Sequence, residues 1–129
     1  MTDNEQRIAI AEALGWAWYR RPATGIWAKK PMRTLYHPKI HSEYVESLDL
    51  ADGAERQCNE TFIWREGMVP DFTQDLNAMH DAESTLFGIQ CENYARLLCG
   101  VGLLFWPVAH ASASQRAEAF LRTLGRWHD

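Results

Sequence analysis

The residues best suited to chemistry in this chain are aromatic and cationic side chains gathered between positions 16 and 36. Aromatic rings can stack on bases, and Arg or Lys can hold phosphate oxygens. Because the chain has no glycine-rich phosphate loop, any phosphate contact here depends on side chains. The candidate ligand-binding residues, called the basic–aromatic strip, are Trp16, Trp18, Arg20, Arg21, Trp27, Lys29, Lys30, Arg33 and Tyr36.

Three interpretations of the basic–aromatic strip stay open. Its rings belong to the core and its cations to a solvated hairpin tip, or the strip binds a nucleotide or nucleic acid, or it binds a protein. Alternation along a strand would place Trp16 and Trp18 on one face. Ala17 and Tyr19 would then lie on the other face, so that one pair can be core while the other is exposed.

A second candidate is the histidine pair of the sequence HPKIH, His37 and His41. Their four-residue spacing would suit a metal ion if the segment were helical. Pro38 lies between them, however, no second pair of ligands stands nearby, and Cys58 has no assigned position. We therefore interpret both as solvent-exposed histidines of a loop, and we predict no metal site and no cofactor.

A third candidate is the polar group Asn77, His80, Asp81 and Glu83. On a helix, His80 and Glu83 share one face, and a carboxylate there could poise the imidazole for acid–base catalysis. The alternative is a polar helix face whose other side is buried. No nucleophile accompanies the group, since Ser112 and Ser114 are better explained as helix caps. The chain also has no GxSxG, P-loop, dinucleotide, HExxH or zinc-ribbon motif, so we predict no catalytic residue and no enzyme.

The charges are segregated along the chain. Residues 13–42 hold six cations and no acid, whereas residues 43–60 hold six acids and one Arg, and residues 66–92 hold six acids and neither Lys nor Arg. The net charge of −4 is too small to indicate mimicry of a polyanion. The opposed stretches either neutralise one another within the fold or do so between subunits, and this, with the six Trp residues, favours a homo-oligomer.

The length of 129 residues predicts a single domain over 1–129, with one hydrophobic core. Three cysteines without a CxxC pair, and no signal-peptide or membrane-spanning pattern, indicate a reducing cytoplasm. We expect Cys91 and Cys99 to be buried thiols on a helix.

Helix-start signals and strand-forming runs predict the elements of the first half. Thr2 and Glu5 form a capping-box pair, and Gly15 is a natural stop for the helix that follows. The predicted elements are a helix over 3–14, a β-hairpin with strands at 16–19 and 26–28, an irregular loop or insertion at about 31–59 with one helical turn near 43–48, and a strand over 61–65.

The sequence VPDFTQDLNAMHDAE (residues 69–83) predicts the start of another helix. Pro70 excludes helix behind it, and Asp71 with Gln74 matches a capping box. The helix is expected to end near Leu86. Its core-facing stripe is predicted to be Phe72, Leu76, Met79 and Leu86.

Two further helices and a strand are predicted near the end of the chain. A helix over 89–99 should face the core with Cys91, Tyr94, Ala95, Leu98 and Cys99. A strand over 103–109 follows. Ser112 and Gln115 then open a helix that Gly125 ends. Its apolar face comprises Ala117, Phe120, Leu121 and Leu124.

These elements predict an α+β fold, with helices packed on a small, mostly antiparallel sheet as an α/β sandwich. The predicted order is α-β-β-(loop)-β-α-α-β-α. Residues 69–83, 113–125 (ASQRAEAFLRTLG) and 8–19 (IAIAEALGWAWY) resemble, in order and position, the phage ABA sandwich domain family of phage and prophage proteins. This resemblance implies a sandwich fold and a viral origin. It implies no established activity, and residues 31–59 have no counterpart in it.

We therefore expect a non-catalytic phage or prophage protein that acts in the host cytoplasm against a defence system. It would sequester a nucleotide-like anionic ligand or block a host defence protein, without a membrane partner. Two alternatives stay open: nucleic-acid binding through the basic–aromatic hairpin, and a small hydrolase that uses His80. The net acidity disfavours nucleic acid, because affinity for a duplex depends on neutralising phosphates.

Overall fold

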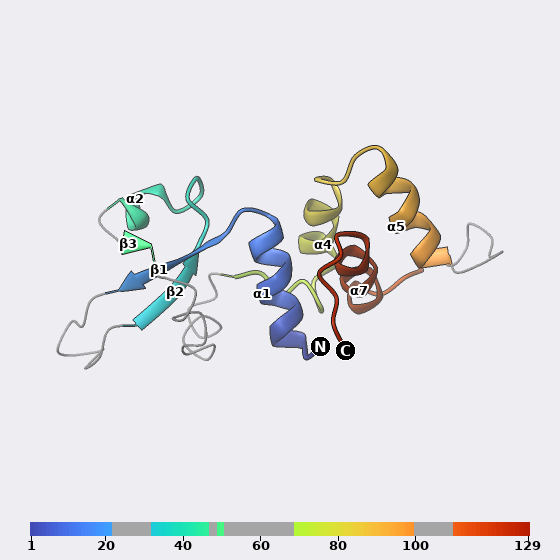
Figure 1. Cartoon of the computed structure of the whole chain (residues 1–129), viewed down its shortest axis with the longest axis horizontal. Coiled ribbons are helices and arrows are strands. Elements are labelled where there is room, and N and C mark those ends of the chain that lie inside the picture. Colours follow the sequence, from blue (N-terminus) through green and yellow to red (C-terminus); the bar gives the residue numbers. More distant parts are fainter. Residues whose placement is uncertain (22–31, 47–48, 51–68, 100–109) are drawn as a thin grey trace. The chain divides into compact units, whose positions relative to one another are not determined.

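The chain divides into two compact units, one formed by residues 1–14 with 70–129 and the other by residues 15–69 (Figure 1). The computed structural model describes residues 1–21, 32–46, 49–50, 69–99 and 110–129. The first unit is helical and the second holds a small sheet, so the predicted mixed α+β composition is confirmed. Predicted strands 26–28, 61–65 and 103–109 lie outside the described residues.

The sheet unit is built on one antiparallel pair of strands. β1 (Ala17–Arg21) pairs with β2 (Met32–Tyr36), and the short β3 (Asp49–Leu50) pairs with the other edge of β1, which gives the order β2-β1-β3. A helical turn, α2 (Ser42–Val45), lies between β2 and β3 in the chain. The prediction of a helical turn in this region is confirmed.

The prediction that residues 31–59 are irregular is wrong for β2 and β3. Strand β2 has the sequence MRTLY, which places apolar residues at both even and odd positions. A strand that is buried on both faces shows no alternation of polar and apolar residues, so periodicity does not reveal it.

Buried side chains lie on both faces of the β1–β2 pair. Trp18 and Leu35 are register partners and are 5% and 0% exposed. On the alternate face, Tyr19 and Tyr36 are also buried, and their ring centroids lie 6.2 Å apart. Cross-strand and diagonal pairs of this kind are the main source of stability in a small sheet.

Four helices of the other unit are described. They are α1 (Asp3–Ala13), α4 (Leu76–Glu83), α5 (Ile89–Cys99) and α7 (Ala113–Thr123). Helix α7 packs against each of the other three, and Figure 1 shows it beside α4 and α5. Its Phe120 and Leu121 are fully buried, together with Ile10 of α1 and Met79 of α4. The core of this unit therefore lies around α7.

The predicted capping boxes of α1 and α7 are confirmed. The Thr2 hydroxyl accepts from the Glu5 N–H, and the Glu5 carboxylate accepts from the Thr2 N–H. Ser112 and Gln115 make the same reciprocal pair on α7. Past the C-terminal ends of these helices, Gly15 and Gly125 have φ values of 97° and 68°, which glycine adopts without steric cost.

The predicted cap of α4 is wrong by four residues. The cap is Asp75, whose carboxylate accepts from the N–H groups of Asn77 and Ala78 at 2.9 and 3.4 Å. Asp71 instead closes a turn in which its carboxylate accepts from the Thr73 hydroxyl and its carbonyl accepts from the Asp75 N–H. Each aspartate is a good cap by itself, and burial of Phe72 and Thr73 selects the later start.

Two predictions of burial are wrong in this unit. Leu76, expected in the core with Phe72, Met79 and Leu86, is the first residue of α4 and is 44% exposed, whereas the other three are buried. On α5 the predicted bounds are confirmed, but Tyr94 is its buried residue, while Cys91 and Ala95 are exposed. Helix α5 packs mainly against α7, so one narrow face of it is covered. No helix within the described residues is long and apolar enough to cross a membrane.

Candidate functional site

The β1–β2 register gathers the cationic residues at one end of the hairpin. Arg20 pairs with Arg33, and Arg21 pairs with Met32, at the end where residues 22–31 connect the strands. Trp27, Lys29 and Lys30 belong to this connection and lie outside the described residues. Strand pairing therefore brings together at least three of the predicted cationic positions, which we call the cationic end of the hairpin.

Strand β3 adds an acidic residue to the same row of the sheet. Arg20 has Arg33 as its Cα partner on β2 and Asp49 as its partner on β3. Like charges directly opposite one another destabilise a sheet, whereas opposite charges stabilise it. The row Arg33–Arg20–Asp49 therefore carries one positive charge in excess.

The three aromatic members of the strip that the structure describes lie in the sheet unit's core. Trp16, Trp18 and Tyr36 are 8%, 5% and 2% exposed. Trp16 precedes β1 and packs edge-on against the imidazoles of His37 and His41, with centroid distances of 5.9 and 5.2 Å. These rings leave little free face for stacking on a base.

One polar atom of this core has no hydrogen-bond partner. The indole Nε1 of Trp18 is buried and meets no acceptor among the described residues. Trp18 and Arg20 are two residues apart on β1, so both positions belong to one face of the strand. A buried donor without an acceptor costs about 1–3 kcal/mol, and native proteins seldom retain one. The sequence gives no signal for this atom beyond the rule that a buried Trp needs a partner.

His37 and His41 are partly buried, and the prediction that both belong to a solvent-exposed loop is wrong. Nδ1 of His41 accepts from the His37 N–H at 3.0 Å, and Nδ1 of His37 accepts from the Lys39 and Ile40 N–H groups at 3.2 and 3.3 Å. Both δ nitrogens therefore hold backbone in place. No cluster of three or more metal-ligating side chains occurs in the described part of the chain.

The polar group on α4 joins a bonded network in the helical unit. The Tyr94 hydroxyl donates to the Glu83 carboxylate, and Nη1 of Arg116 donates to the same oxygen at 3.0 Å. Nε of Arg116 donates to the Ala111 carbonyl at 3.1 Å. Three helices, α4, α5 and α7, are thus joined through Glu83.

The network alters the acid–base properties of its members. Burial, followed by the hydrogen bond to Glu83, raises the pKa of Tyr94 far above its ordinary value. Burial alone would lower the pKa of Arg116, but its hydrogen bond and attraction to Glu83 outweigh burial and raise the pKa. Both groups therefore keep their protons throughout the physiological range.

His80 stands at the exposed edge of this network. Its Nδ1 lies 3.4 Å from the other oxygen of Glu83, and its side chain is 57% exposed, compared with 17% for Glu83. This pairing matches the predicted shared face of the helix. The Glu83 carboxylate accepts hydrogen bonds from Tyr94 of α5 and Arg116 of α7, so its role in this network is to join the helices.

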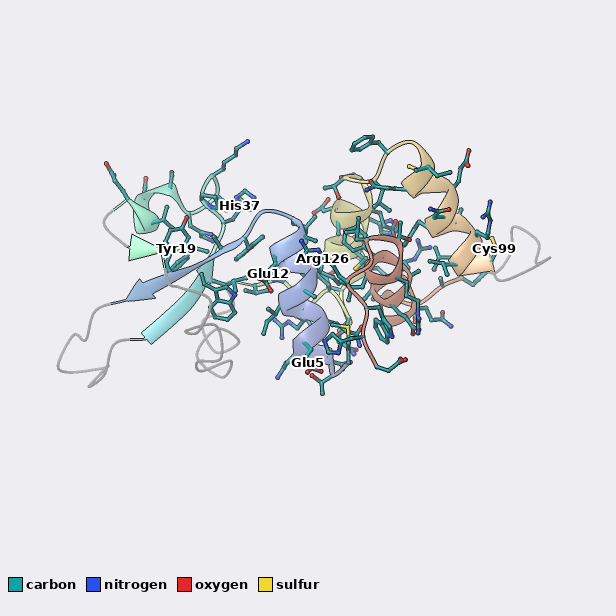
Figure 2. The ribbon with its side chains drawn as sticks, in the orientation of Figure 1. Glu5, Glu12, Tyr19, His37, Cys99 and Arg126 are labelled. Atoms are coloured by element: carbon teal, nitrogen blue, oxygen red, sulfur yellow. The ribbon has the colours of Figure 1, made fainter. Side chains whose placement is uncertain are left out.

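Two surface clefts of the helical unit contain no residue of the basic–aromatic strip. One, of about 430 Å³, lies between α5 and α7 and includes Leu97, Ala119 and Arg122. The other, of about 310 Å³, lies along α1 and includes Glu12 and Arg126, which Figure 2 labels.

The chain matches no family model, no curated protein and no solved structure.

Proposed function

We propose that the protein is a non-catalytic binding protein that sequesters a nucleotide-like anionic ligand at the cationic end of the β1–β2 hairpin. The supporting observation is the buried Trp18 Nε1–H, which lacks an acceptor among the described residues and shares a strand face with the position of Arg20. A phosphate or carboxylate oxygen is the acceptor such a donor requires, and it would also balance the excess charge of the row.

The buried rings restrict the kind of ligand contact. Trp16, Trp18 and Tyr36 are packed within the unit, so recognition would rest on the cations and the indole N–H, and less on base stacking. This favours the phosphate part of a nucleotide as the anchored group. In this proposal the basic–aromatic strip divides into a cationic contact surface and an aromatic support.

A small anionic ligand is favoured over an extended nucleic acid. The cations of the strip occur within one hairpin, and the whole chain carries a net charge of −4. Affinity for a duplex depends on neutralising many phosphates, and a net negative protein repels the rest of the polymer. The three described cationic positions at this end, Arg20, Arg21 and Arg33, can instead hold one or two phosphate groups.

The wider role follows from the resemblance in residues 8–19, 69–83 and 113–125. We infer a sandwich protein of phage or prophage origin that acts as a homo-oligomer in the host cytoplasm and withholds a signalling nucleotide from a defence system. Blocking a host defence protein is the second form of the same role. Neither form requires a catalytic residue, and Glu83, the best-placed carboxylate, joins three helices.

Calorimetric titration with three probes tests this proposal: a linear dinucleotide, inorganic phosphate and a 20-base single-stranded DNA. We expect the dinucleotide to bind, and we expect the Arg20→Gln/Arg33→Gln variant to bind it at least tenfold more weakly, which corresponds to about 1.4 kcal/mol. Lys39→Gln is the matched control, because Lys39 is an exposed cation of the same unit outside the row.

Binding of the 20-base DNA but not of the dinucleotide, with an affinity that falls steeply as salt is added, would favour the nucleic-acid alternative over this proposal. Absence of binding by all three probes, or equal losses in the double variant and in Lys39→Gln, would contradict the cationic end as a ligand site.

A further inference from the structure

The turn between β2 and α2 is held by two imidazoles that act as hydrogen-bond acceptors. Its sequence is HPKIH, from His37 to His41. Three backbone N–H groups, those of His37, Lys39 and Ile40, donate to the two δ nitrogens over 3.0–3.3 Å. The His41 N–H in turn donates to the His37 carbonyl at 2.8 Å. The two histidines thus support each other's backbone.

These bonds specify one protonation state. A neutral imidazole has one donor and one acceptor nitrogen, and an imidazolium has two donors. Because both δ nitrogens accept, each proton must lie on Nε2. Protonation at Nδ1 would remove the acceptor for all three N–H groups and would direct a new N–H at each of them.

The same imidazoles are part of the packing of the sheet unit. The His41 ring lies edge-on to Trp16 and Tyr36, at centroid distances of 5.2 and 5.5 Å, and His37 packs on Trp16. Among the described residues, the titratable or charged groups near His41 include His37 from the turn, the exposed Lys39 and Glu43 beside it in the chain, and the phenol of Tyr36 on β2, which itself packs on Tyr19 of β1. The carboxylate in this set, that of Glu43, is exposed.

We propose that the HPKIH turn is an acid-responsive switch, in which protonation of the two histidines releases the connection between β2 and α2. Loss of the two δ-nitrogen acceptors would release the three N–H groups of the turn, and the two charged rings would repel each other. The consequence is local opening of the sheet unit at the end of the hairpin opposite its cationic end, while the helical unit keeps its bonds.

The acid–base behaviour of His41 agrees with this geometry. Burial, and then repulsion by His37, lowers the pKa of His41. A histidine whose pKa is lower in the folded state contributes stability that is present above its unfolded pKa, near 6.5. That stability is lost as the pH falls from there through the lowered pKa.

Nitrogen-15 NMR of the full chain between pH 7.5 and 4.5 tests the switch directly. At pH 7.5 we expect His37 and His41 to show the Nε2–H tautomer. On acidification the amide resonances of Lys39 and Ile40 should shift and exchange faster together with the titration of the rings. A δ-protonated tautomer at pH 7.5, or unchanged Lys39 and Ile40 amides at pH 4.5, would overturn the proposal.

The His37→Asn/His41→Asn variant separates two properties of the histidines, their ability to accept hydrogen bonds and their ability to take up a proton. An Asn side-chain oxygen can accept from backbone N–H groups two residues on, as in an Asx turn, but it cannot be protonated in this range. We expect the Lys39 and Ile40 amides of this variant to be insensitive to pH, whereas His80→Asn should retain the wild-type response. An acid response that persists in the double variant would show that other groups drive it.

Discussion

The two units differ in how their polar groups are paired. In the helical unit, Arg116 donates to both Glu83 and the Ala111 carbonyl, and Tyr94 donates to Glu83. In the sheet unit, Arg20 and Arg33 are register partners of the same sign, and the buried Trp18 N–H has no described acceptor. The groups of the first pattern bond to one another, whereas the second pattern leaves a buried donor without a described acceptor, next to two cationic positions.

The hydrogen-bond partners of these groups distinguish a structural cluster from a candidate site better than their residue types do. By residue type, His80 and Glu83 resemble a catalytic pair, yet the Glu83 carboxylate joins three helices. The helical unit does contain one comparable unpaired atom, the buried Oε1 of Gln6, but the amide of that residue donates to the Met1 carbonyl. No row of like charges accompanies it in the described part of that unit.

The largest effect is expected from Arg116→Met. This change removes the cation from a carboxylate that is 17% exposed. Breaking a buried ion pair leaves an uncompensated charge, so the free energy of unfolding of the helical unit should fall by about 3 kcal/mol. Urea denaturation measures it.

The matched control for Arg116→Met is Arg122→Met on the same helix. Its ion pair with Glu118 spans 2.8 Å, but both side chains are more than 40% exposed, so the loss should be about 0.5 kcal/mol. Equal losses for the two variants would show that the Glu83 network does not hold the helices.

A smaller loss is expected from Tyr94→Phe. The hydroxyl donates to an ionised carboxylate, so its removal should cost about 1.5 kcal/mol. Because burial and Glu83 raise the pKa of Tyr94 in the folded state, wild-type stability should fall as the pH rises above the unfolded value of about 10. Denaturation between pH 9 and 11 should show that fall in the wild type and a flatter profile in the variant. The same alkaline slope in both would contradict the network.

Trp18→Phe should have little effect on the stability of the ligand-free sheet unit. Removing an unpaired buried donor should leave the stability of the ligand-free protein within about 1 kcal/mol of wild type. Dinucleotide affinity should fall about tenfold if the indole donates to a phosphate. Denaturation with and without ligand measures both quantities. A variant that binds as tightly as wild type would remove Trp18 from the site.

The smallest effect is expected from Asp49→Asn. Asp49 is the Cα partner of Arg20 on β3, so under our proposal it would compete with the ligand for the positive charge of the row. Cross-strand charge pairs contribute about 0.5 kcal/mol, and affinity for the dinucleotide should rise two- to threefold. Calorimetry at low salt resolves this change, and a weaker affinity would place Asp49 among the groups that favour binding.

Local signals in the sequence predict most of the helical unit. The capping boxes at Thr2 and Ser112 and the glycines after α1 and α7 act within one turn of chain, so they can be recognised without knowledge of the fold. The cap of α4 could not be assigned, because Asp71 and Asp75 both satisfy the rule. Only the burial of Phe72 and Thr73 decides between them.

The sheet unit and the candidate site depend on contacts that are distant in the chain. The residues of the cationic end can be recognised in the sequence. Their pairing cannot, because it depends on the register of β1 with β2 and β3, and the strand predicted at 26–28 is not the partner that places Arg20 beside Arg33 and Asp49. Whether the Trp18 N–H has an acceptor among the described residues depends on what surrounds the indole. Neither feature can be derived from spacing alone, and the α/β sandwich remains a prediction.

The central claim is that the cationic end of the hairpin binds a nucleotide-like anion through Trp18. Its most direct test is a proton–nitrogen NMR titration of the labelled chain with the dinucleotide, in which Trp18→Phe assigns the indole resonance. We predict that the Trp18 Nε1–H resonance shifts together with the Arg20 and Arg33 amides, while the Arg116 and Tyr94 amides stay in place. An unmoved Trp18 indole at saturating ligand would contradict the claim.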